Sequence, residues 1–336
     1  LISGWVATGW GSDRLGSIEF VRGSAFDDRI IGNGAWNSLW GGDGDDVLIG
    51  RGGSDSLNGG PGDDDLRGNG GSDTVDGWEG DDRLDGGDGG DLLRGRSGHD
   101  MLIGGPGDDR LDGGVGSDWV SFKNAPGLGG NYRDGVRVDL AFGSASTGDG
   151  DDTLESVENI IGSPRGDNLD GDDFRNIISG GGGQDGIEGR GGADRLFGGA
   201  DHDHLLGGGG NDLIEGHAGM DSLEGGFGDD TLRGGSGDDR IEPGGGDDSV
   251  AGGDGTDRIM YEQSPRGVAI SLLTGIATGW GTDTFVGISD VWGSWHDDDI
   301  VGNAQANYID GRGGDDRIQA GNGDDIVLGE AVSYTH

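Results

Sequence analysis

The chain has no cysteine, and only 6% of its 336 residues are aromatic. Without cysteine, neither disulfides nor thiolate-bound zinc can hold a fold together. No apolar run approaches the roughly 20 residues that a membrane-spanning helix needs. The first residues, Leu1 to Trp5, show neither the basic region nor the long apolar region of a signal peptide. What dominates instead is 84 glycines and a formal net charge of -43, which excludes nucleic-acid binding through phosphate contacts.

A strict period of nine residues organises most of the sequence. From Gly23, eleven consecutive blocks of nine run to Ser121, eleven more occupy residues 162–260, and four occupy residues 293–328. The pattern is Gly-Gly-x-Gly-x-Asp-x-aliphatic-x; position six is Asp in 23 of the 26 blocks and Asn in three, and position eight is always Ile, Leu or Val. A chain this acidic and this poor in apolar residues is often disordered. A disordered chain does not need a strict nine-residue period, however, so the period argues against simple disorder.

Three breaks in the period resemble one another. Thr8 to Leu15, Thr147 to Leu154 and Thr278 to Phe285 align at spacings of 139 and 131 residues. The short repeat therefore lies inside a long repeat of about 135 residues, and we expect the chain to be a segment of a longer protein. The predicted domains are a capping segment 1–22, a β-roll 23–121, a linking segment 122–161, a β-roll 162–260, a linking segment 261–292, a β-roll 293–328 and a tail 329–336.

The nonapeptide predicts an all-β fold. Its glycines permit a tight turn over the first six positions, and the last three positions make a minimal strand with one side chain pointing inward. Two nonapeptides close one coil of 18 residues. Stacked coils form two parallel sheets, and within each sheet the strands of successive coils lie about 4.8 Å apart. We therefore predict tandem parallel β-rolls, which are β-solenoids with 18 residues per coil, joined by short β capping segments.

In such a stack the position-six carboxylates repel one another unless a cation lies between them. Asp46 would stack on Asp64, and Asp55 on Asp73. Ca²⁺ accepts 6–8 oxygen ligands, which carboxylates and turn carbonyls supply, whereas Mg²⁺ requires a small octahedron and retains its waters. One aliphatic side chain per nine residues buries too little apolar surface to order a glycine-rich backbone, so metal binding is expected to contribute to folding.

The sequence therefore predicts about twenty bound calcium ions, with one expected ligand in each of twenty blocks. These candidate ligands are Asp46, Asp55, Asp64, Asp73, Asp82, Asp91, Asp100, Asp109, Asp118, Asp185, Asp194, Asp203, Asp212, Asp221, Asp230, Asp239, Asp248, Asp257, Asp316 and Asp325. The first two blocks of each run, which we call lead-in blocks, differ from these twenty, which we call ladder blocks. Lead-in blocks lack Gly at position four, and the second of each pair has Asn37, Asn176 or Asn307 at position six. We expect lead-in blocks to bind calcium poorly.

By these motifs the chain resembles the RTX (repeats-in-toxin, haemolysin-type) calcium-binding proteins, with about 234 of 336 residues in frame. The resemblance implies bacterial origin, secretion, and folding on meeting extracellular calcium. The resemblance does not fix an activity, and our leading hypothesis is an extracellular or cell-surface structural or adhesive protein, with calcium ions as partners and copies of itself, a cell-surface ligand or a polysaccharide as further candidates. No catalytic residue and no transmembrane segment is expected here. The alternative function is an accessory region of a secreted enzyme whose catalytic domain lies outside this segment.

Two further features have competing interpretations. His202 and His204 flank Asp203, and a transition-metal site competes there with the favoured interpretation of solvated surface histidines. Most tryptophans, including Trp36, Trp40, Trp280, Trp292 and Trp295, fall in breaks or lead-in blocks. The favoured interpretation is that they cap open sheet edges, and the alternative is a sugar-binding face.

Overall fold

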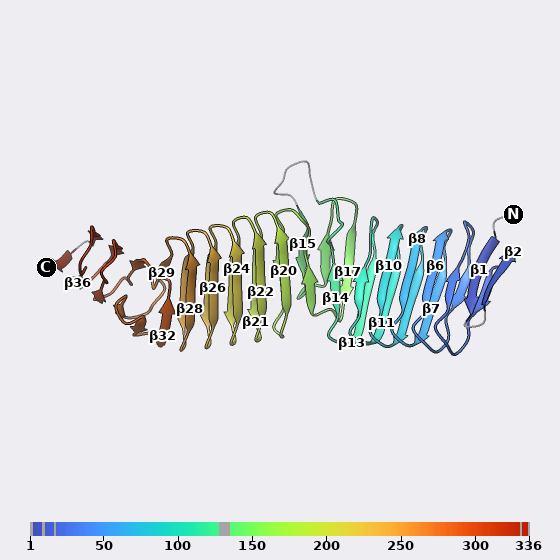
Figure 1. Cartoon of the computed structure of the whole chain (residues 1–336), viewed down its shortest axis with the longest axis horizontal. Helices are drawn as coiled ribbons and strands as arrows, with labels where there is room; N and C mark the ends of the chain where they lie inside the picture. The colour runs from blue at the N-terminus through green and yellow to red at the C-terminus, as the bar shows by residue number, and fades with distance from the viewer. Residues whose placement is uncertain (1–2, 9–10, 17, 128–134, 330, 335–336) are drawn as a thin grey trace. The chain divides into compact units, whose positions relative to one another are not determined.

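The computed structural model describes residues 3–8, 11–16, 18–127, 135–329 and 331–334 (Figure 1). Every regular element in these ranges is a β-strand, so they contain no helix of the length and apolarity needed to cross a membrane. The chain divides into two compact units, residues 1–164 and 165–336. Each unit is a parallel β-solenoid, which confirms the predicted fold class.

In the first unit, alternate strands go to alternate sheets. One sheet contains β4 (Arg29–Ile31), β6 (Val47–Gly52), β8 (Asp65–Gly70), β10 (Arg83–Asp88), β12 (Met101–Ile103), β14 (Trp119–Ser121) and β18 (Asn159–Ile161). The other contains β3 (Phe20–Arg22), β5 (Ser38–Trp40), β7 (Ser56–Pro61), β9 (Thr74–Glu79), β11 (Leu92–Gly98) and β13 (Arg110–Gly116).

Register follows the 18-residue spacing because the position-eight side chains stack on one another. Leu48 pairs with Leu66, and Leu66 pairs with Leu84, on one side of the coil. Leu57 and Val75 pair in the same way on the other. Of the 26 position-eight residues, 25 are buried, and the exception is Val327 in the last coil. A shift by one residue would turn this whole core toward solvent, so the pattern holds the register.

The second unit repeats this arrangement. One sheet contains β20 (Ile177–Gly182), β22 (Arg195–Ala200), β24 (Leu213–Ala218), β26 (Thr231–Ser236) and β28 (Ser249–Asp254). The other contains β19 (Asn168–Asp170), β21 (Gly186–Gly191), β23 (His204–Gly209), β25 (Ser222–Phe227), β27 (Arg240–Gly245), β29 (Arg258–Met260), β33 (Asp290–Trp292), β35 (Tyr308–Asp310) and β37 (Ile326–Leu328).

The breaks insert antiparallel strands into the solenoid and also continue its core. In the first unit, β15 (Arg137–Asp139), β16 (Ser144–Ser146) and β17 (Asp151–Glu155) form a meander, and β17 then pairs in parallel with β13. Leu154 thereby stacks on Leu111. In the second unit, β30 (Ala269–Ser271), β31 (Ile276–Thr278) and β32 (Thr282–Val286) do the same. There β32 follows β28, and β30 pairs with β34 (Asp299–Val301), which precedes β36 (Asp315–Gln319).

Short strands lie at both ends of the described chain. β1 (Ser3–Thr8) pairs antiparallel with β2 (Gly11–Gly16) and with β4. β38 (Ala331–Tyr334) pairs in parallel with β36. Trp10, part of the first predicted break motif, lies outside the described residues.

Candidate metal centre

The position-six aspartates form two buried columns, one along each edge of the solenoid. In each column the backbone N–H of one aspartate donates to the Oδ1 atom of the next aspartate, 18 residues on. The N to Oδ1 distance is 2.7 Å from Asp46 to Asp64, 2.8 Å from Asp64 to Asp82 and 2.9 Å from Asp185 to Asp203. Stacked coils thus bring the predicted residues together, and one oxygen of each carboxylate has a backbone donor.

The second carboxylate oxygen is unpartnered in almost every ladder block. Among the described residues, the Oδ2 atom is buried without a hydrogen-bond partner in nineteen of the twenty candidate ligands. The exception is Asp325 in the last coil, which is half exposed and whose Oδ1 accepts the Asn307 N–H at 3.0 Å. Unpaired buried carboxylate oxygens are strongly unfavourable, so a regular series of nineteen points to a missing positive partner.

Nearly all of these oxygens lie in a space that glycine at position one leaves open, and the exception is the block of Asp248, which begins with Pro243. A Cβ atom added at Gly41, in position one, would lie 2.0 Å from Asp46 Oδ2 and 2.7 Å from the Gly59 carbonyl oxygen of the next coil. At Gly68 the corresponding distances are 2.2 Å to Asp73 Oδ2 and 2.6 Å to the Gly86 oxygen. A carboxylate oxygen and a backbone carbonyl oxygen therefore converge between neighbouring coils.

The donor chemistry fits a hard cation. Within the described ranges, no three His, Asp or Glu side chains gather closely enough to hold a metal by side chains alone. A cation in this column would therefore also take backbone carbonyl oxygens, which is how Ca²⁺ completes its 6–8 ligands. The residues present fit calcium, and they lack the nitrogen and sulfur donors that zinc prefers.

The columns also make the aspartates hard to ionise without a cation. Burial, together with charge repulsion from neighbouring aspartates, raises the pKa of Asp64 to about 7 and those of Asp82 and Asp185 to about 8. The backbone N–H donated by the preceding coil opposes this shift. At neutral pH the metal-free column therefore contains carboxylates that the fold disfavours in their charged form.

Three residues of the columns were missed by the sequence analysis because they lie in the breaks. Asp109 N–H donates to Asp152 Oδ1 at 3.1 Å, Asp118 N–H to Glu158 Oε2 at 2.8 Å, and Asp248 N–H to Asp283 Oδ1 at 3.1 Å. A signal was present for two of them. Gly148-Asp149-Gly150-Asp151-Asp152-Thr153-Leu154 matches positions two to eight of the nonapeptide, and Gly279-Trp280-Gly281-Thr282-Asp283-Thr284-Phe285 matches positions two to seven, with Phe in place of the aliphatic residue.

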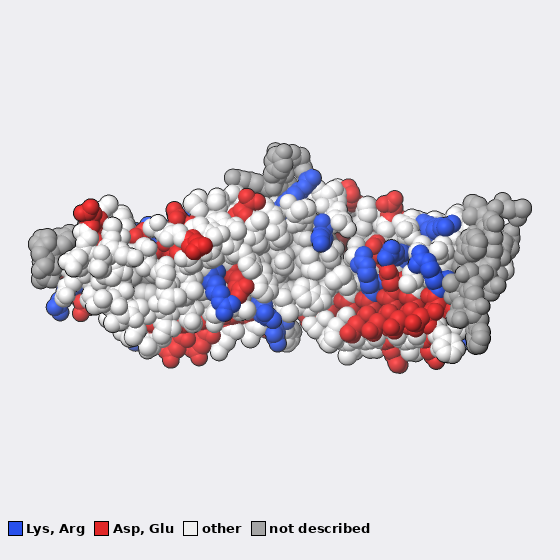
Figure 2. Space-filling model, viewed as in Figure 1, with Lys and Arg blue, Asp and Glu red and all other residues white. Residues whose placement is uncertain are grey.

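Outside the buried columns runs a second, exposed ladder at position five. Asp45 N–H donates to Asp27 Oδ1 at 3.1 Å, Asp63 N–H to Asp45 at 3.0 Å and Asp81 N–H to Asp63 at 2.8 Å. These aspartates are exposed, and Figure 2 shows acidic side chains gathered on one face of the first unit. Their Oδ1 atoms already accept backbone donors, so this ladder supports the coil spacing.

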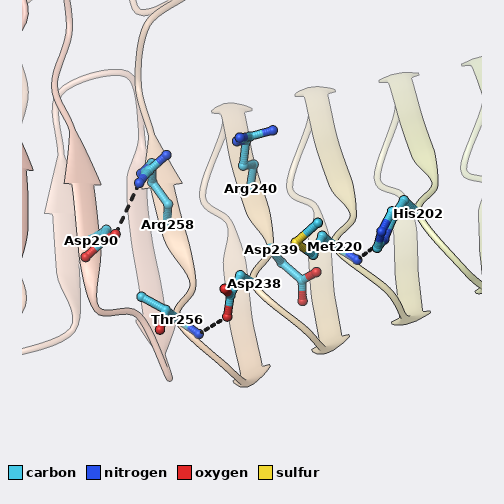
Figure 3. A pocket seen from close by; sticks show the side chains of 8 residues that line it. All are labelled: His202, Met220, Asp238, Asp239, Arg240, Thr256, Arg258 and Asp290. Carbon is cyan, nitrogen blue, oxygen red and sulfur yellow. Dashed lines mark hydrogen bonds and ion pairs between the residues drawn. The ribbon is translucent and has the colours of Figure 1, made fainter.

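In the second unit the same ladder borders a groove of about 460 Å³ (Figure 3). His202 Nδ1 accepts the Met220 N–H at 2.7 Å, Asp238 Oδ1 accepts the Thr256 N–H at 2.9 Å, and Arg258 pairs with Asp290 at 3.2 Å. His202 and His204 are both exposed, in agreement with the favoured interpretation of surface histidines.

The described tryptophan side chains have different surroundings. Trp292 is packed between two guanidinium groups, with Arg258 at 4.4 Å and Arg312 at 4.1 Å from its ring centroid. Trp280 meets Phe227 edge-to-face at 6.1 Å. Trp36, Trp40, Trp78 and Trp295 are each more than 40% exposed. Cation–π stacking of this kind stabilises the third break and leaves little of Trp292 for a ligand.

Comparison with protein families agrees with this geometry. A family model described as the RTX calcium-binding nonapeptide repeat, four copies long, matches residues 16–48, 49–84, 58–93, 85–120, 161–196, 188–223, 215–250, 224–259 and 292–327. Together these matches cover well over half of the chain. No curated protein matches the chain.

Proposed function

The chain belongs to the family of RTX calcium-binding nonapeptide-repeat proteins, and from this premise we propose that its twenty ladder aspartates are the calcium ligands. We further propose that calcium coordination drives the rolls to fold after secretion, giving an extracellular structural or adhesive element. About twenty ions would be bound, one for each ladder block. The proposal retains the seven segments predicted from the sequence as its functional divisions.

The single observation that carries this proposal is the series of nineteen buried, unpartnered Oδ2 atoms. In many of these blocks a carbonyl oxygen of the next coil lies beside the same space, as at Asp46 and Gly59. Bound Ca²⁺ supplies the positive charge that these oxygens lack. The protein's own part is to hold the carboxylate in place through the Oδ1 hydrogen bond and, where position one is glycine, to keep a Cβ out of the space.

Folding coupled to calcium follows from the same geometry. Without a cation the folded chain must either protonate its buried carboxylates or leave them charged and unpaired, and both alternatives cost free energy. The unfolded chain hydrates the same carboxylates in water. Calcium binds the folded arrangement preferentially, so its binding free energy becomes folding free energy.

Circular dichroism during a calcium titration of the whole chain tests this function. We expect little β structure in excess chelator at pH 7.5 and a cooperative gain of β signal as calcium is added. Magnesium at the same concentration is the control and should produce a much smaller gain, because it does not fit a large all-oxygen site. A chain that is fully folded in chelator and indifferent to calcium would contradict the proposal.

A further inference from the structure

The turns of the 26 blocks have two conformations, and the backbone at position two separates them. In all twenty ladder blocks the position-two residue is left-handed, with φ from 64° at Arg312 to 129° at Gly42. Non-glycine residues adopt this conformation there too, including Arg51, Trp78 and His217. In the six lead-in blocks the described position-two residue has no positive φ. We call the two conformations the open turn and the closed turn.

In the closed turn, the position-two amide occupies the oxygen that is free in the open turn. Ser24 N–H donates to Asp28 Oδ2 at 2.6 Å, and Ser294 N–H donates to Asp298 Oδ2 at 2.7 Å. The amides of Asn33, Asp172 and Asn303 donate to Asn37, Asn176 and Asn307 Oδ1 at 2.7, 2.8 and 3.0 Å. In these closed blocks the side-chain oxygen that faces the turn is therefore occupied by the block's own backbone, while Asp28 Oδ1 stays buried without a partner.

Position four explains why a block takes one conformation or the other. In the open turn, a Cβ at Gly71 would lie 1.9 Å from the Gly53 carbonyl oxygen, and one at Gly80 would lie 2.0 Å from the Gly62 oxygen. These are backbone atoms of the preceding coil and cannot move aside. The lead-in blocks have Phe26, Ala35, Arg165, Phe174, His296 and Gln305 at this position. Even the small methyl group of Ala35 accompanies a closed turn.

One ladder block tests this rule within the chain. Asp201 stands at position four of an open turn and has a left-handed φ of 77°. Aspartate tolerates this region better than most residues with a Cβ, because its short polar side chain bonds locally. Phenylalanine and alanine adopt this region much more rarely, which agrees with the closed turns at Phe26 and Ala35.

Two closed blocks have everything else that the open blocks have. Beside Asp28, a Cβ at Gly23 would lie 2.6 Å from Asp28 Oδ2 and 2.1 Å from the Gly41 oxygen. Beside Asp298, a Cβ at Gly293 would lie 2.2 Å from Asp298 Oδ2 and 3.0 Å from the Gly311 oxygen. The carboxylate, the neighbouring carbonyl and the glycine are all present, but the Oδ2 atom that is free in the open turn accepts the position-two amide, and at Asp28 the unpartnered buried oxygen is Oδ1 instead.

We propose that the residue at position four decides which blocks bind calcium, by switching the turn between the open and closed conformations. Glycine there opens the turn and frees the position-six carboxylate for Ca²⁺; phenylalanine, alanine or histidine closes it, and the position-two amide takes the oxygen instead. This inference rests on the proposed calcium function of the ladder. It assigns a selecting role to Phe26 and His296, which touch no calcium themselves.

The test is to open a closed block with one substitution and count the ions. Phe26→Gly leaves Asp28 and Gly23 in place and removes only the Cβ-bearing side chain, which is 66% exposed in the native chain. Native mass spectrometry of the full chain in calcium counts bound ions singly. We expect Phe26→Gly to bind one ion more than the native protein. His296→Gly should do the same in the second unit, independently.

The matched controls are Phe26→Ala and His296→Ala, which keep a Cβ at position four and should bind the native number of ions. Circular dichroism in calcium establishes that each variant is folded. If a variant at one site does not fold, the other site still tests the proposal. Equal ion counts for the Gly and Ala variants at both sites would overturn the switch. A native chain that binds no calcium would instead overturn the proposed function, so the two failures are distinguishable.

Discussion

The lead-in coil of residues 23–40 and the ladder coils of residues 41–121 share a core and differ in their turns. Ile30 and Leu39 are as buried as Leu48 and Leu57, and all four stack in the same two sheets. The turns of the lead-in coil donate to Asp28 Oδ2 and Asn37 Oδ1 and leave only Asp28 Oδ1 unpaired, whereas every block of the ladder coils leaves its Oδ2 atom unpaired. The core therefore specifies where a coil lies, and the turn specifies whether the coil needs a metal.

The largest expected difference appears when calcium is withdrawn. As chelator lowers free calcium stepwise, amides of ladder coils such as Asp64 and Leu84 should lose hydrogen-exchange protection before those of Ser24 and Asn33. Each ladder coil is left with two unpaired Oδ2 atoms, whereas the lead-in coil has one unpaired oxygen, Asp28 Oδ1. Hydrogen exchange followed by mass spectrometry measures this order. A single simultaneous transition in all coils would remove the energetic distinction between the two regions.

Lowering the pH should stabilise the metal-free ladder coils, and it should leave the lead-in blocks that have asparagine at position six unchanged. Burial raises the pKa of Asp64 to about 7 and that of Asp82 to about 8, so these carboxyls bind protons more tightly in the folded than in the unfolded chain. The resulting stabilisation of the metal-free fold is complete below the ordinary pKa near 4 and is lost as the pH rises to about 8. Without calcium, the chain should therefore gain β structure between pH 8 and pH 4.

Calcium affinity should change in the opposite direction, because protons compete with the metal for the same oxygens. Below pH 6 we expect the apparent affinity to fall about tenfold per pH unit for each carboxylate that must lose a proton. Isothermal titration calorimetry at pH 5 and pH 8 measures this difference. An affinity independent of pH would contradict the involvement of the buried aspartates.

Substitutions at position six should affect ion binding and stability differently in the ladder coils and in the lead-in coil. Asp64→Ala combined with Asp82→Ala should reduce the number of bound ions by two and lower the melting temperature only when calcium is present. Asn37→Ala removes the acceptor for the Asn33 N–H and should cost about 1 kcal/mol of unfolding free energy without losing an ion. Ion counts and thermal unfolding together distinguish these results. Loss of an ion from Asn37→Ala would place calcium in the lead-in coil.

The most local effect is expected in the break. Tyr261 is buried, and its hydroxyl donates to Asp283 Oδ2 at 2.8 Å, so this column residue is satisfied without a metal. Tyr261→Phe should cost about 1–3 kcal/mol, because the oxygen loses its donor. Phe122 occupies the equivalent place in the other break, so phenylalanine fits the space. Urea denaturation in calcium checks this, and an unchanged midpoint would show that Asp283 needs no donor.

Much of the fold and the candidate site could be predicted because the chain is periodic. A repeat of nine with one inward aliphatic allows few packings, so the 18-residue register and the buried Leu48, Leu66 and Leu84 follow from spacing alone. The stacking of Asp46 on Asp64 follows in the same way. The breaks could not be predicted to the same degree, because β15–β17 and β30–β32 are joined by pairing rather than by a period.

By itself, then, the sequence determined which residues face inward, which aspartates form columns, and how the coils are spaced. Only the tertiary structure decided which of those aspartates keep an oxygen free, because that depends on whether a Cβ at position four meets the carbonyl of the preceding coil. It also decided that Asp152 and Asp283 continue the columns through the breaks. These are contacts between coils, and no single nonapeptide contains the atoms on both sides of them.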